Sequence, residues 1–119
     1  MKIIQVVNAL PSLQKLAGQD MSIQKLYKIS KLLGNLDKEI AFYNEQRSRI
    51  LSQYCDIEGN QYVPKAEFAT KLNAELDELL NTEIECDINE VVIGTNEDVR
   101  LSYNDLMALQ NFVRIEEAV

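Results

Sequence analysis

Apolar residues recur at alternating steps of three and four positions across residues 26–54, and this spacing constrains the fold more than any other feature. Side chains three and four positions apart share one face of a helix, so the pattern predicts a single amphipathic helix over 22–54, capped by Asp20 or Ser22. A helix of that length is about 50 Å long. The apolar stripe has one charged member and consists of Leu26, Ile29, Leu33, Leu36, Ile40, Tyr43, Arg47, Ile50 and Tyr54.

A turn signal and a second apolar pattern follow, and together they predict a helical hairpin. Residues 55–63 contain Glu-Gly-Asn, which favours a turn, and Pro64 stands where a helix can begin. Residues 64–80 then carry apolar side chains at helical spacing. Because a short connection makes two helices antiparallel neighbours, we expect a long antiparallel helical hairpin over 22–80.

The two helices of this hairpin differ in length, so part of the apolar stripe needs another cover. The uncovered part runs from Leu26 to Leu36. Three alternatives can supply this cover: the N-terminal segment 3–17, a C-terminal helix or a second subunit. The stripe has regular heptad spacing, so two or more chains could pair along it, and a coiled-coil homo-oligomer is an alternative to a monomer.

The N-terminal segment also has helical spacing, but it contains a proline. Proline in a helix interior removes a hydrogen bond and clashes with the preceding turn. We therefore expect a break near Asn8, with Pro11 in the first turn of a helix that ends at Gly18. Residues 2–7 are rich in Ile and Val and fit a short strand as the alternative to a helix.

The periodicity changes further along the chain, and we expect a small β element near 83–101. Residues 83–88 alternate acidic and apolar side chains, which is typical of a half-buried strand. Residues 91–93 form a short apolar run, and a turn at 94–98 leads to a second short strand at 99–101.

A last helix is expected over 103–115. Ser102 and Asp105 have the spacing of a capping box, with Asp in place of the usual Glu or Gln. The predicted fold class is therefore mainly α: a long antiparallel helical hairpin with flanking short helices and a small β element. We expect residues 1–119 to form a single domain.

Composition excludes most enzyme classes. The chain of 119 residues has no histidine, so it lacks the commonest general base and metal ligand. Its two cysteines, Cys55 and Cys86, are too few for a zinc site, and its four glycines are isolated rather than grouped in a phosphate-binding loop. We expect a non-enzymatic protein with no cofactor and no metal. Without a recognisable leader or a long apolar run, we expect reduced cysteines, a cytoplasmic location and no membrane binding.

Negative charge is concentrated in one part of the chain. The net charge is −7, and residues 72–99 contain acidic residues but no Lys or Arg. Such a block is either a solvated face or a face that meets basic groups, and it argues against direct binding of nucleic acid. A metal site is disfavoured because side chains on one face of a strand lie too far apart to share an ion. The candidate partner-binding residues in this block are Glu83, Glu85, Asp87 and Glu90.

Two arginines form the second candidate group. Arg47 lies in the apolar stripe, where it either marks the solvated end of the hairpin or sets the register of an oligomer. Arg47 and Arg49 are alternatively suited to binding a phosphate or a nucleotide. A basic stripe of Lys25, Lys28 and Lys31 occupies the first half of the long helix, and we expect it to face the acidic block.

Several segments follow one another in a recognisable order. They are residues 8–17 (Asn-Ala-Leu-Pro-Ser-Leu-Gln-Lys-Leu-Ala), 27–30 (Tyr-Lys-Ile-Ser), the end of the long helix near Tyr54, 79–88 and 101–109. This order resembles a family of small phage and prophage proteins of uncharacterised function. The resemblance implies a phage genome as the source and a short α-helical protein as the fold. It supplies no catalytic residues.

The expected function is protein–protein binding or assembly, through a helix face and the acidic surface, with a phage structural protein as partner. One alternative is an inhibitor of a host nucleic-acid-binding defence protein, in which the acidic block 72–99 docks on a basic groove. The other is a protein that binds or sequesters a nucleotide or another small molecule with Arg47, Arg49 or the lysines.

Overall fold

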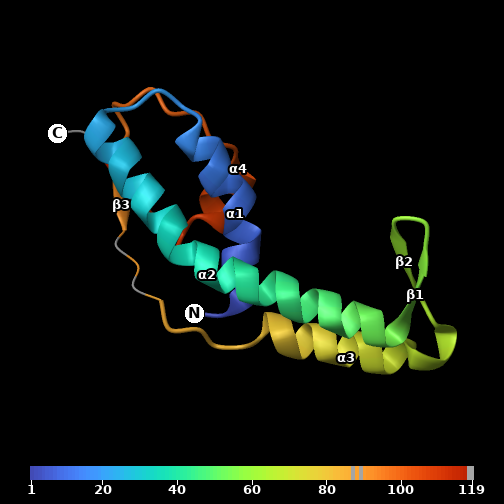
Figure 1. The fold of residues 1–119 in the computed structure, drawn as a ribbon. Coiled ribbons are helices and arrows are strands. Elements are labelled where there is room, and N and C mark those ends of the chain that lie inside the picture. The colour runs from blue at the N-terminus through green and yellow to red at the C-terminus, as the bar shows by residue number, and fades with distance from the viewer. Residues whose placement is uncertain (87, 89, 118–119) are drawn as a thin grey trace.

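The computed structural model describes residues 1–86, 88 and 90–117, and it is mainly helical with two small sheets. Figure 1 shows an elongated molecule, and its extents are 59 × 29 × 22 Å. The elements are α1 (Ile3–Ala17), α2 (Ile23–Tyr54), β1 (Cys55–Glu58), β2 (Gln61–Pro64), the 3-10 helix η1 (Ala66–Phe68), α3 (Ala69–Leu80), β3 (Val91–Gly94), α4 (Tyr103–Ala108) and β4 (Val113–Glu116).

The predicted long helix is present as α2, which has 32 residues. Of the two predicted caps, Ser22 is the one present: its side chain accepts a hydrogen bond from the Lys25 N–H. Among the helices that the structure describes, none is both long and apolar enough to cross a membrane.

Helix α1 corrects both expectations for the N-terminal segment. It runs without a break through Pro11, and residues 2–7 form no strand; Lys2 alone makes an isolated bridge, with Glu83. An interior proline costs about 3 kcal/mol. Burial of one face on both sides of Pro11 offsets this cost, and the proline itself lies on the exposed side. The buried residues of that face are Ile3, Val6, Ala9, Leu13 and Leu16.

The main core is built from segments far apart in the sequence. Helix α1, the N-terminal half of α2, β3 and the segment around α4 surround it, as Figure 1 shows. The α2 residues Ile29 and Leu36 are fully buried there, whereas Leu26 and Leu33 are half-buried, so the chain covers the first half of the apolar stripe in part. The core consists of Val6, Ala9, Leu13, Leu16, Ile29, Leu32, Leu36, Val91, Ile93, Leu109, Phe112 and Val113.

A second, smaller core lies at the other end of α2. Figure 1 shows α3 beside the C-terminal half of α2, with β1 and β2 projecting beyond both. We call residues 41–80 the arm. Leu51, Tyr54 and Leu72 are buried there together with Cys55, and Ile50, Phe68 and Leu76 pack against them.

The connection between α2 and α3 differs from the expected turn. Residues 55–58 and 61–64 form an antiparallel β hairpin, so the next helix does not begin at Pro64; η1 precedes it, and α3 begins at Ala69. Gly59 has a φ of 62°, and no other described residue has a positive φ. This is the backbone of a two-residue type II′ turn, which requires glycine at its first central position.

The C-terminal β element forms with different strands from those expected. Within the described residues, neither 83–88 nor 99–101 forms a strand. Asp87 lies outside the described residues. Helix α4 ends at Ala108 instead of extending to 115, and β4 pairs in parallel with β3. Val91 and Ile93 of β3 are buried, and buried backbone groups need hydrogen-bond partners. Residues 113–116 supply these partners as a strand instead of continuing the helix.

The predicted capping box at the start of α4 is present. The Ser102 side chain accepts from the Asp105 N–H, and the Asp105 carboxylate accepts from the Ser102 N–H. The same carboxylate also accepts hydrogen bonds from Ser12 and Lys15 of α1. The capping group therefore also fastens α4 to α1.

Candidate functional site

The tip of the arm is a β hairpin with an exposed apolar face. Ile57 and Tyr62 are cross-strand partners, so their side chains share one face of the hairpin. Their exposed fractions are 66% and 40%. Large apolar side chains that stand together in solvent are a candidate interaction surface.

The hairpin also has two unpaired strand edges. Its sheet consists of β1 and β2 only, and no further strand pairs with it within the described residues. Unpaired edges offer backbone N–H and C=O groups to a third strand. An isolated two-stranded hairpin is marginally stable in water, so contact with a partner would stabilise this one.

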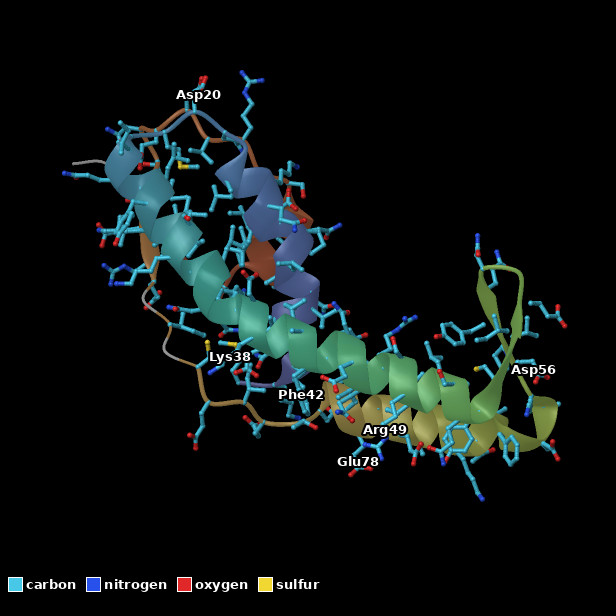
Figure 2. All side chains as sticks on the ribbon, viewed as in Figure 1. Asp20, Lys38, Phe42, Arg49, Asp56 and Glu78 are labelled. Carbon is cyan, nitrogen blue, oxygen red and sulfur yellow. The ribbon has the colours of Figure 1, made fainter. Side chains whose placement is uncertain are left out.

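Side chains at the base of the hairpin anchor it to the helices. The rings of Tyr54 and Phe68 lie 5.6 Å apart between centroids, and the Lys65 ammonium stands 6.0 Å from the centre of the Phe68 ring. Lys65 also donates its N–H to the Tyr54 carbonyl at 3.1 Å and forms an ion pair of 3.5 Å with Asp56. Figure 2 labels Asp56 on this projecting hairpin. The apolar tip is therefore held at a defined position on α2 and α3.

A polar groove of about 300 Å³ runs along the same arm between α2 and α3. Figure 2 shows Phe42, Arg49 and Glu78 on this side. The Oε2 atom of Glu75, which also lines the groove, is buried without a hydrogen-bond partner among the described residues. Burial of the phenol raises the pKa of Tyr54, and the hydrogen bond and negative charge of the Glu75 carboxylate raise it further. A hydrogen-bond donor from outside would satisfy the Glu75 oxygen.

The structure separates the two predicted arginines. Positions two apart on a helix point in different directions; both arginines are exposed, and Arg49 lines the groove whereas Arg47 does not. The two guanidinium groups therefore do not converge on one phosphate from a single chain.

The acidic candidates are spread over several environments. Glu83 accepts a hydrogen bond of 3.0 Å from the N-terminal ammonium group, and Glu85 is exposed. Glu90 lines a cavity of about 340 Å³ together with Lys28 and Lys31 of α2. This is the meeting of the basic stripe and the acidic block that the charge pattern predicts.

The third lysine of the stripe is paired within the chain. Lys25 forms an ion pair with Glu97, whose carboxylate also accepts a hydrogen bond from the Gly94 N–H at 2.6 Å. The hydrogen bond from Lys25, followed by that from Gly94, lowers the pKa of Glu97. This contact closes the loop after β3 onto the N-terminus of α2.

Sequence reasoning missed the exposed tip of the arm. The signal was present: Gly59-Asn60 separates a run with alternating apolar residues, 55–58, from a run that contains Tyr62 and Val63, and such a two-residue glycine turn is typical of a β hairpin. Because helical periodicity flanks residues 55–63 on both sides, the segment was interpreted as a turn between two helices. The described residues contain no group of three or more metal-ligating side chains that could hold an ion. Comparison with protein-family models, with curated proteins and with solved structures finds no match to this chain.

Proposed function

We propose that this protein is a non-enzymatic binding or assembly protein of phage type, and that the tip of its arm contacts the partner. In this function, α2 and α3 act as one antiparallel helical hairpin that presents β1 and β2. The exposed pair of Ile57 and Tyr62, on strands with unpaired edges, is the observation that carries it. The phage assignment rests on the resemblance of the sequence segments alone.

Two further features of the arm support a protein partner over a small ligand. The apolar tip is convex, whereas small molecules bind in concave pockets. The groove between α2 and α3 lies on the body side of the tip, and there Glu75 and Arg49 offer an acceptor and a donor on the same arm. Protein interfaces combine apolar contacts with hydrogen bonds, and the arm offers both kinds of group.

A comparison of three tagged proteins from phage-infected cells tests this function. They are the wild type, Ile57→Ser/Tyr62→Ser, and Ile23→Ser, which alters an apolar side chain that is 84% exposed in the body. We expect the wild type and the Ile23→Ser control to capture the same protein and the double variant to lose it. Binding is then measured with both components purified. Equal affinity of all three proteins for the purified partner would exclude the tip as the interface.

The cavity beside Lys28 and Lys31 favours a second candidate, the binding of a small anionic ligand such as a nucleotide. Its volume of about 340 Å³ lies at the lower end of the range for ligand pockets. A thermal-shift panel of nucleotides tests it, with Lys28→Ala/Lys31→Ala as the variant. Stabilisation of the wild type but not of the variant would support this function. The inhibitor alternative has less support, because Glu83 and Glu97 form ion pairs within the chain.

A further inference from the structure

The outer edge of β4 is a second surface without a partner, and it lies away from the arm. Strands β3 and β4 form a parallel pair, and Figure 1 shows β3 at the opposite end of the molecule from the β1–β2 hairpin. In the pairing with β3, the carbonyls of Phe112 and Glu116 accept from the N–H groups of Val91 and Thr95. Because backbone groups alternate along a strand, the N–H and C=O of Ile115 point away from β3.

These two groups of Ile115 make no hydrogen bond with any residue that the structure describes. The Ile115 side chain is 45% exposed, although its neighbour on β3, Ile93, is buried. Ile115, Leu106 and Ile93 help to line an apolar cavity of about 220 Å³. The edge thus combines free backbone groups with an apolar surface, which are the two requirements for adding a strand.

The charges of β4 are complementary to those of its own reverse, because Arg114 and Glu116 flank Ile115 with opposite signs. In an antiparallel pair, a residue with both backbone groups on the shared edge exchanges two hydrogen bonds with the residue opposite. If Ile115 lies opposite Ile115 of a second copy, Arg114 of each chain lies opposite Glu116 of the other. Both side chains are exposed, and they already form an ion pair of 2.9 Å within the strand. Opposite charges across a strand pair stabilise it, and two such pairs form at once.

We propose that a second copy of this chain binds along β4, so that two β3–β4 sheets join into one four-stranded sheet around a two-fold axis at Ile115. The apolar cavity beside Ile115 then receives the partner's side chains at this edge, which extends each core across the interface. A two-fold contact requires a patch that complements itself, and the order Arg114-Ile115-Glu116 meets that requirement. A contact of this small size gives a dimer whose population depends on concentration.

The dimer through β4 differs from the coiled-coil oligomer that the apolar stripe of the long helix suggests. Ile29 and Leu36 of the stripe are fully buried inside the chain, whereas the β4 edge is exposed in the folded protein. A dimer through β4 leaves both arms free at the far ends of the assembly. The inference therefore stands independently of the function proposed for the arm.

Ile115→Pro tests the edge directly. Proline removes the outward N–H and blocks the edge, but it leaves the hydrogen bonds to β3 in place. We expect sedimentation equilibrium of the wild type to show a mass rising with concentration towards twice 13.6 kDa. We expect Ile115→Pro to remain at 13.6 kDa with an unchanged circular dichroism spectrum. A wild type that stays monomeric at its solubility limit overturns the proposal.

A charge-swap pair keeps the test valid if the proline variant fails to fold. Arg114→Glu places like charges opposite each other, and so does Glu116→Arg; we expect each to weaken self-association about tenfold. An equimolar mixture of the two restores opposite charges, and we expect it to form a heterodimer. No restoration on mixing, or a wild-type dimer that only Ile57→Ser/Tyr62→Ser disrupts, overturns the proposal and moves the interface elsewhere.

Discussion

Lys15 and Asp105 form an ion pair of 2.7 Å between Nζ and Oδ2, although 90 positions separate them in the sequence. The same carboxylate accepts a hydrogen bond of 2.8 Å from the hydroxyl of Ser12, which is buried. It therefore joins α1 to α4 while it caps α4. The hydrogen bonds from Lys15, the Ser102 N–H and Ser12 hold the pKa of Asp105 well below its usual range.

The lowered pKa of Asp105 predicts a loss of stability in acid. The unfolded chain protonates this carboxyl near its ordinary pKa of about 3.9, whereas the folded protein keeps it charged. Its contribution is therefore complete above that pH and falls as the pH drops below it. We expect the free energy of unfolding, from urea titrations between neutral pH and acid, to fall less steeply for Asp105→Asn than for the wild type.

Lys15→Met provides the matched control for this network. It removes the largest cause of the lowered pKa but keeps the cap and the bond from Ser12. We expect the acid dependence of this variant to lie between those of the wild type and Asp105→Asn. If all three proteins lose stability in parallel, Asp105 does not govern the acid transition.

Two glycines are expected to respond in opposite directions to alanine. A methyl group at Gly34 meets no atom within 4 Å, so Gly34→Ala should stabilise α2 by about 1 kcal/mol through helix propensity. Gly59 has a φ of 62°, so Gly59→Ala should destabilise the hairpin by about 1–2 kcal/mol. Chemical denaturation measures both effects. The same sign for the two substitutions would contradict the assigned turn.

The two cores predict different consequences of cavity formation. Leu13→Ala in the main core should lower the free energy of unfolding of the whole protein by about 2–5 kcal/mol. Leu72→Ala in the small core should instead raise amide hydrogen exchange mainly in the arm, where few buried side chains hold the helices together. Hydrogen-exchange mass spectrometry distinguishes the two patterns. Equal exchange of arm and body in Leu72→Ala would show that the two cores unfold together.

Removing the proline from α1 tests why that helix remains continuous. Pro11 is exposed, so Pro11→Ala restores an N–H donor without disturbing the buried face. We expect stabilisation of up to about 3 kcal/mol, reduced by the greater freedom of the unfolded chain. Urea denaturation measures it. A destabilised variant would mean that the fixed backbone of proline matters more than the missing hydrogen bond.

Local sequence patterns were sufficient wherever the determining contacts are a few residues apart. The extent of α2, its cap at Ser22 and the capping box at Ser102 all depend on groups within one helical turn. The sequence also predicted that Lys28 and Lys31 meet acidic groups, since the order of segments carries both to the same end.

Tertiary structure decided the features that depend on distant partners. Residues 113–115 were predicted to end a helix, but they form a strand because the buried backbone of Val91 and Ile93 needs hydrogen bonds. Pro11 stays inside a helix because the main core buries both halves of α1. The sequence by itself determined the extent of α2 and the start of α4, through contacts within one turn of helix. Only the folded core determined which remaining segments pair as strands, because a strand is stabilised by a neighbour that local spacing does not identify.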